Sequence, residues 1–330
     1  LAGAIDQATL REGVKVTPMP NDSSLYSYYD PGSGVYSISW TREPRTEYCV
    51  TVSDGVADVY GNSLASTEEF CFETGDFPPV FDLVSAYQGL TLDASNPSII
   101  YFLARNVDRV DFTLAEIDAE TLMQRPQASG DVIREWTERF DPDPNAVDVA
   151  PVYLRRLRGA LPTGLYRLRW QIAGRESFGR HIDVAVIDRH VMVKLASEEA
   201  MAWVTDLSSG VPISRTAVQL VDRDGLLIAG ATTDDDGIAR FPINPLDDLW
   251  GDVAAVTGEP EAEGFGFALT SWQGNASPWA FGLDLAWGPR PPYRLFLHTD
   301  RPLYRPEQTV RFHGVLREDA DARSEEHTSE

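Results

Sequence analysis

Basic residues, cysteines and long apolar runs are all scarce in this chain of 330 residues. The 28 Lys and Arg are outnumbered by 51 Asp and Glu, which leaves a formal net charge of −23. Because nucleic-acid binding requires clustered cations, we expect no nucleic-acid partner. No window approaches the ~18 uninterrupted apolar residues of a membrane helix, so no transmembrane segment is expected in this sequence.

Positive charge is dense only at Arg155-Arg156-Leu157-Arg158, beside a turn. The cluster is short, and we interpret it as the polar positions of a strand end rather than as a phosphate-binding patch.

Both ends of the sequence are interpreted as cut ends. Leu1 is not an initiator Met, and no basic-then-apolar signal stretch follows it. Residues Arg323–Glu330 resemble the translated readthrough of a sequencing adapter and are left out of the fold reasoning. We therefore expect the chain to be a fragment of a longer parent protein.

Short β-type segments recur along the whole chain. They are rich in Val, Ile, Tyr, Phe and Thr and are separated by Gly, Pro, Asp and Asn, a pattern typical of β-sandwiches. Residues Leu165–Trp170 alternate apolar and basic side chains, as expected for a half-buried strand. The predicted fold class is all-β: tandem Ig-like β-sandwich domains with a short helical insertion.

The insertion is predicted at Asp131–Phe140. Val132, Ile133, Trp136 and Phe140 recur near the helical spacing of 3.6, and Asp131 is a candidate N-cap. The prolines that follow would end such a helix.

Changes in composition predict the domain boundaries. Turn-forming residues replace strand residues at Gly75–Pro79, Asp188–Arg189 and Trp287–Pro292. The predicted domains are 1–76, truncated at its N-terminus, then 77–188 and 189–290, and finally 291–322 as the start of a further domain, with 323–330 set aside as the adapter segment.

The two cysteines, Cys49 and Cys71, lie in predicted strands with large apolar residues on either side. The two cysteines would therefore both point outward, on the same face of a sheet, and adjacent antiparallel strands would bring them together. The resulting disulfide would close a loop of roughly 20 residues and contribute about 3 kcal/mol. Two free thiols are the alternative, and they suit a reducing compartment.

Recognisable catalytic, cofactor-binding or metal-binding motifs are missing from the sequence. Asp234–Gly237 resembles part of an EF-hand, but Ile243 stands where the ion requires a bidentate Glu, so we predict a hairpin turn. No nucleophile elbow, His-Glu-x-x-His motif, phosphate-binding glycine loop or zinc-ligand spacing occurs. We therefore expect neither an enzyme nor a cofactor or metal site.

Three segments resemble known domains. Residues 46–75 resemble the closing half of a bacterial Ig-like domain, on Tyr48–Val52, Val56–Leu64 and Phe72–Gly75. Residues 190–245 resemble a macroglobulin domain of the bacterial alpha-2-macroglobulin family, on Ala202–Ile213 and Thr232–Phe241.

The third segment, His298–Val310, resembles the opening of the next macroglobulin domain. The residues that carry this match are Thr299, Asp300, Arg301, Pro302, Tyr304, Arg305 and Pro306. Glu307 departs from the family, which commonly has Gly there, so a type I turn is expected in place of type II.

The resemblance implies that the chain is part of the scaffold of an inhibitor that traps endopeptidases, and that it comes from the N-terminal portion of that inhibitor. In that family a protease cuts an exposed bait segment and the domains rearrange around it. Neither cysteine lies in the Cys-x-Glu-Gln setting of the thioester that many members carry. The expected partners are proteases, reached through the full-length parent. The expected location is the periplasm or cell surface, or secreted, with anchoring through a missing N-terminus left open.

The alternative function is an Ig-like adhesion or carbohydrate-binding array. A group of aromatic residues would supply the sugar platform of such an array. In the protease-trap interpretation the same residues would form a core and an interdomain seam. These residues are Phe265, Phe267, Trp272, Trp279, Phe281 and Trp287.

Overall fold

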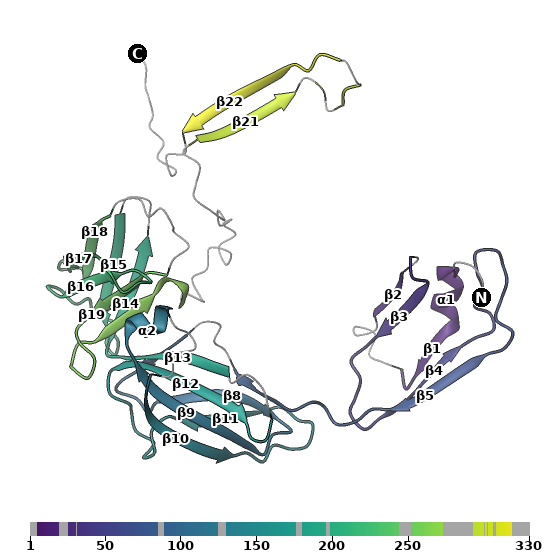
Figure 1. The fold of residues 1–330 in the computed structure, drawn as a ribbon, viewed down its shortest axis with the longest axis horizontal. Helices are drawn as coiled ribbons and strands as arrows, with labels where there is room; N and C mark the ends of the chain where they lie inside the picture. Colours follow the sequence, from purple (N-terminus) through teal and green to yellow (C-terminus); the bar gives the residue numbers. More distant parts are fainter. Residues whose placement is uncertain are drawn as a thin grey trace.

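The computed structural model describes residues 5–19, 26–30, 32–84, 89–124, 130–175, 180–195, 199–243, 252–272, 293–299, 301, 303–305 and 308–318. Within these residues the strands fall into three bodies that follow one another along the chain, with a β-hairpin after them (Figure 1). The predicted all-β fold class is confirmed. No helix of the described segments is long and apolar enough to cross a membrane.

The N-terminal body is a small sheet with one helix. Its elements are α1 (Gln7–Gly13), β1 (Val14–Thr17), β2 (Tyr26–Asp30), β3 (Val35–Ser39), β4 (Glu47–Val52) and β5 (Glu68–Glu73). Strands β1, β4 and β5 form one sheet, and β2 pairs with β3. The carboxylate of Asp6 caps α1, accepting from the N–H groups of Ala8 at 2.8 Å and Thr9 at 3.2 Å.

The second body is a two-layered sandwich. Its elements are β6 (Val80–Leu83), β7 (Leu90–Asp93), β8 (Ile99–Arg105), β9 (Arg109–Ile117), α2 (Ala119–Gln124), β10 (Asp131–Arg139), β11 (Asp148–Tyr153), β12 (Gly164–Ile172) and β13 (Arg180–Ile187). One sheet has the order β10-β9-β12-β13-β7 and the other has the order β11-β8-β6.

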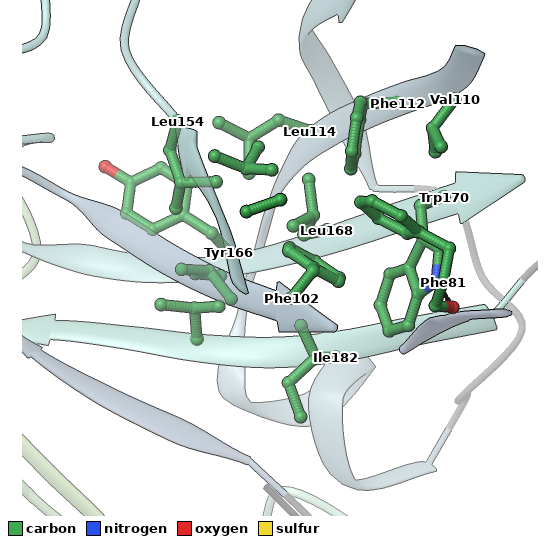
Figure 2. Packing of buried hydrophobic residues seen from close by; sticks show 14 of the residues in the cluster. Phe81, Phe102, Val110, Phe112, Leu114, Leu154, Tyr166, Leu168, Trp170 and Ile182 are labelled. Carbon is green, nitrogen blue, oxygen red and sulfur yellow. Dashed lines mark hydrogen bonds between the residues drawn. The ribbon is translucent and has the colours of Figure 1, made fainter. Parts of the chain in front are cut away.

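Aromatic and aliphatic side chains fill the space between these two sheets (Figure 2). The ring centroids of Phe81 and Phe102 are 4.7 Å apart, and Trp170 meets Phe102 edge-on at 5.1 Å. Strand β12 is buried on both faces, since Leu165 and Arg167 are covered as well as the residues that face this core. This is more burial than its alternating sequence predicted.

The predicted helix at Asp131–Phe140 is wrong. These residues form strand β10, which pairs antiparallel with β9 over most of its length. A register shift between Val132 and Arg134 marks a β-bulge at this end of the strand. It leaves Val132 and Ile133 50% and 47% exposed, whereas Trp136 packs against the core. The extra residue breaks the alternation of period 2 and mimics a helical spacing.

The third body is also a sandwich, and we call the second and third bodies the second and third sandwiches. Its elements are β14 (Arg189–Leu195), β15 (Glu199–Asp206), β16 (Ala217–Val221), β17 (Leu227–Thr232), β18 (Ile238–Pro242), β19 (Ala254–Thr257), β20 (Gly266–Leu269) and the 3₁₀ turn η1 (Thr270–Trp272). Its sheets have the orders β14-β15-β18 and β17-β16-β19-β20. The Asp234–Gly237 segment is a turn before β18. Gly237 has φ 76°, and a Cβ there would lie 2.6 Å from the carbonyl oxygen of Val204.

The described chain ends in a hairpin of β21 (Tyr293–Thr299) and β22 (Phe312–Glu318). Its pairs run in register from Tyr293 opposite Glu318 to Thr299 opposite Phe312.

Candidate functional site: the joints between the bodies

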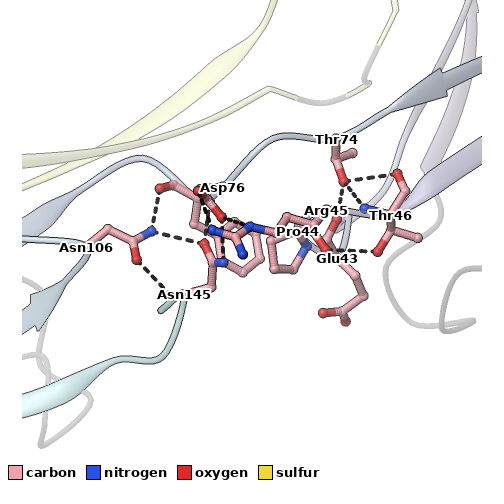
Figure 3. Close-up of polar contacts among 9 residues, drawn as sticks. Glu43, Pro44, Arg45, Thr46, Thr74, Asp76, Asn106 and Asn145 are labelled. Atoms are coloured by element: carbon pink, nitrogen blue, oxygen red, sulfur yellow. Dashed lines mark hydrogen bonds and ion pairs between the residues drawn. The ribbon is translucent and has the colours of Figure 1, made fainter. Parts of the chain in front are cut away.

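The N-terminal body and the second sandwich are joined by a polar clasp centred on Asp76. The guanidinium of Arg45 donates to both carboxylate oxygens of Asp76, at 2.6 and 3.0 Å (Figure 3). The side-chain amide of Asn145, from the second sandwich, donates to the same carboxylate at 2.8 Å. One carboxylate of the linker therefore holds a group from each body. Hydrogen bonding from Arg45, and then from Asn145, lowers the pKa of Asp76.

Two asparagines fix the linker to the second sandwich. Asn145 Oδ1 accepts from the N–H of Phe77 at 2.7 Å, and Asn106 Nδ2 donates to the carbonyl of Phe77 at 2.7 Å. The backbone N–H of Asn145 donates to Asn106 Oδ1 at 2.8 Å. Asn106 has φ 52° and Asn145 has φ 65°, and Asn tolerates positive φ better than most residues do. The linker is thus held at its backbone as well as at Asp76.

Water reaches the clasp. The side chains of Arg45 and Asp76 are 66% and 47% exposed, so salt screens their attraction. The contacts that Arg45, Asp76 and Asn145 make at this joint are therefore polar and accessible to water.

The joint between the second and third bodies is apolar. A cluster of buried side chains, which we call the seam, draws on α2 and sheets of both sandwiches. Its members are Ile117, Leu122, Leu165, Ala185, Ile187, Ala254, Phe265, Phe267 and Leu269. The second and third sandwiches thus share a hydrophobic cluster in addition to the separate core of each.

Trp272 packs at the seam. Its ring meets Phe267 edge-on with centroids 5.6 Å apart. The ring also lies so close to Gly89 of the second sandwich that a Cβ on Gly89 would come within 2.1 Å of it. Gly89 therefore lets an aromatic side chain of the third body approach the second. Trp279, Phe281 and Trp287, the other aromatics of the predicted sugar platform, lie outside the described residues.

A loop of the third sandwich adds hydrogen bonds beside the seam. The N–H of Glu261 donates to the carbonyl of Thr163 at 2.7 Å, and the Thr163 hydroxyl donates to the carbonyl of Ala262 at 3.0 Å. The carboxylate of Asp188 accepts from the N–H of Gly264 at 2.7 Å. The chain segment that joins the second and third sandwiches at Asp188 is therefore hydrogen-bonded to this loop.

An ion pair is buried in the sheet next to the seam. Arg167 of β12 donates to both oxygens of Asp183 of β13, at 2.6 and 2.9 Å, and the two side chains are 0% and 10% exposed. Arg167 follows Leu165 by two residues on the same face of the strand, so the pair continues the buried face of the seam. Removing either partner would break this ion pair at a buried site, which is destabilising.

Cys49 and Cys71 face each other across β4 and β5, and their sulfur atoms are bonded at 2.02 Å. The carboxylate of Glu69 lies near both sulfurs. Since the sulfurs are bonded to each other, they are not thiolate ligands, and this cluster is no candidate metal site.

The described residues of the third segment that resembled the family, Thr299, Arg301, Tyr304 and Arg305, lie at the end of β21 and in the connection to β22. The Thr299 hydroxyl donates to the Arg301 carbonyl at 2.8 Å, and the Arg301 guanidinium lies 5.7 Å from the ring centroid of Tyr304. The N–H of Arg305 donates to the side-chain oxygen of Gln308 at 3.1 Å. These contacts are local to the turn. Asp300, Pro302 and Pro306 lie outside the described residues.

Sequence reasoning missed the clasp residues. Arg45, Asp76, Asn106 and Asn145 belong to no motif, and the contacts among them span 31 to 69 positions of sequence. The boundary predicted at Gly75–Pro79, which contains Asp76, and the turn preference of asparagine were the available signals.

Comparisons with known proteins agree with this architecture. Residues 187–287 match the family model of the bacterial alpha-2-macroglobulin MG3 domain. The alpha-2-macroglobulin homolog of Nostoc sp. is 20% identical over 94% of this chain and 18% of its own length. The alpha-2-macroglobulin of Ralstonia nicotianae is 31% identical over 46% of this chain and 8% of its own length. The chain thus spans less than a fifth of the length of these relatives.

Solved structures share the fold. The chain aligns with crystal structures of Salmonella alpha-2-macroglobulin, one of a Y1175G mutant and one of the protein reacted with methylamine. The TM-scores are 0.59 and 0.60, at 18% and 17% identity, over 94% and 96% of this chain and 19% and 20% of those chains. The chain therefore contains a segment, residues 187–287, that matches a bacterial alpha-2-macroglobulin MG3 domain, and it is similar to alpha-2-macroglobulins over most of its length.

Proposed function

We propose that the chain is a scaffold portion of an endopeptidase inhibitor that traps its target. The observation that carries the proposal is the MG3 match at residues 187–287, in a chain whose relatives are alpha-2-macroglobulins. In such a trap a protease cuts a bait segment of the full-length protein, and the domains close around it. The partners of the parent are then proteases, and the chain itself performs no catalytic step.

The two joints suit this mechanical role. A cluster of apolar side chains resists bending, because opening it would expose that surface to water. A water-accessible clasp can open at little cost, because water replaces its hydrogen bonds. The second and third sandwiches would then move as one body, and the N-terminal body would turn on the clasp.

We further propose that the chain divides as its composition predicts, at residues 77, 189 and 291. The changes of sheet between β5 and β6, between β13 and β14, and before β21 support these divisions. The disulfide supports an oxidising location, and we propose the periplasm or the cell surface.

The trap is tested with the full-length parent and trypsin. Trypsin held inside a closed trap should lose activity on a large protein substrate and keep it on a small peptide substrate, which can diffuse in. The chain of residues 1–330 alone, at the same molar dose, should leave both activities unchanged. Equal loss of both activities with the parent would indicate ordinary active-site inhibition, and no loss would remove the proposal.

The carbohydrate-binding alternative has its own outcome. Trp272 packs against Phe267 and Gly89, which favours the seam over a sugar platform. Retention of the chain on a glycan array, lost on Trp272→Ala in a protein that still folds, would favour the alternative.

A further inference from the structure

The second sandwich is open along one side. Within the described residues, β10 is the last strand of one sheet and β11 is the last strand of the other, and the two strands follow each other in the chain. A cleft of about 690 Å³ lies on this side. It is lined by Leu114, Ile133, Arg134, Glu135, Trp136, Leu154, Arg155, Arg156 and Leu161. Edge strands present backbone N–H and C=O groups that can pair with another chain.

The floor of the cleft is apolar and held in shape. Leu114, Leu154 and Leu161 are buried. The guanidinium of Arg134 donates to the carbonyls of Tyr153 and Leu154, both at 2.8 Å, and so ties β10 to the end of β11. Burial lowers the pKa of Arg134. The cleft is therefore a built feature of the sandwich.

Trp136 already has two close neighbours at this cleft. Its ring stacks on Phe112 with centroids 5.0 Å apart, and the Arg134 guanidinium lies 3.9 Å from its centroid. A sugar that stacks on this ring would compete with these neighbours, which disfavours carbohydrate as the ligand of this cleft.

The rim of the cleft is basic on a strongly acidic chain. Arg155 and Arg156 are exposed and line the cleft, where Glu135 is the one acidic lining residue among those described. Ile133, at the bulge, adds an exposed apolar side chain. The ligand should therefore carry carboxylates and apolar groups together. An anionic membrane fits less well than a short segment, because a flat bilayer would face the wider surface of a chain whose net charge is −23.

We propose that this cleft docks an extended acidic segment of another polypeptide. The segment adds as a strand to the free edge of β10 along Arg134–Arg139, its carboxylates meet Arg155 and Arg156, and its apolar side chains enter the cleft. The bulge at Ile133 limits pairing at the other end of the strand. The inference does not rest on the proposed protease trap.

The probe is a fluorescently labelled peptide that alternates Glu and Val over about six residues, the usual length of a strand. Fluorescence anisotropy with the full chain should show saturable binding that weakens as salt is added. A peptide alternating Lys and Val should not bind. An acidic peptide with its amides methylated along one edge should also fail, because it cannot complete the backbone ladder.

The variant Arg155→Glu/Arg156→Glu should bind the acidic peptide about tenfold more weakly or worse, since two rim charges become repulsive. The matched control is Arg223→Glu/Arg240→Glu, which makes the same charge change at exposed sites of the third sandwich and should bind normally. Arg155 also donates to the Ala160 carbonyl, so Arg156→Glu alone serves if the double variant alters the circular dichroism spectrum.

Several results would overturn the proposal. They are no binding of the acidic peptide to the unaltered chain, equal binding of the Lys peptide, and binding that the arginine reversals leave unchanged. Vesicles containing phosphatidylserine provide the remaining comparison. Binding to them that depends on Arg155 and Arg156, without peptide binding, would assign the cleft to lipid instead.

Discussion

At the scale of single residues, several of the aspartates in this chain close turns. Aspartate carboxylates accept hydrogen bonds from backbone N–H groups two to four residues further on. The residues that do so include Asp58, Asp93, Asp206, Asp222 and Asp234. This is the usual way in which Asp stabilises turns. In the sequence analysis the negative charge had served only to exclude a nucleic-acid partner.

Asp206 gives a prediction of pH dependence. Hydrogen bonds from the side chains of Ser209 and then Ser208 lower its pKa from 3.8 to about 2. Because the folded pKa lies below the unfolded value, the carboxylate stabilises the fold above about pH 4, and this contribution is lost as the pH falls through about 2. Asp206→Ala should therefore lower the urea midpoint at neutral pH, and the difference from the unaltered chain should shrink on acidification.

The control for this measurement is Asp235→Ala, an exposed aspartate in the neighbouring turn before β18. It should leave the midpoint unchanged at every pH. A difference between Asp206→Ala and the unaltered chain that stays constant down to about pH 2 would show that charge is not the cause.

At the scale of elements, local pattern predicted strands where the alternation is regular and failed where it was broken. The strand at Leu165–Trp170 and the turn at Asp234–Gly237 were predicted from local features, and the structure has both, although that strand is buried on both faces. The bulge in β10 displaced one residue, and a helix was predicted in its place. The clasp could not be predicted, because the contacts of Asp76 with Arg45 and Asn145 span 31 and 69 positions. Periodicity carries no information about such contacts.

Strand β10 can be tested by paired substitutions. Trp136→Ala should lower the free energy of unfolding by about 2–4 kcal/mol, since it removes a ring stacked on Phe112. Ile133→Ala should cost less than about 1 kcal/mol, because Ile133 is largely exposed. A helix would have placed both side chains on one buried face. Equal losses in urea titrations of the two variants would contradict the strand.

At the scale of the whole molecule, the two joints differ in chemistry and should differ in stiffness. Asp76→Ala removes the carboxylate shared by Arg45 and Asn145. We expect a wider spread of interdomain distances in small-angle X-ray scattering and no change in the melting of the two sandwiches. Asp224→Ala, at an exposed site of the third sandwich, is the control and should scatter like the unaltered chain. Identical scattering of all three proteins would show that the clasp does not restrain the N-terminal body.

The most direct test of the scaffold is differential scanning calorimetry of the unaltered chain beside Phe267→Ala. If the seam joins the second and third sandwiches into one body, they should unfold in a single transition. Removing the buried Phe267 ring, at a cost of about 3–5 kcal/mol, should divide that transition in two. Separate transitions of the two sandwiches in the unaltered chain would contradict a shared rigid body.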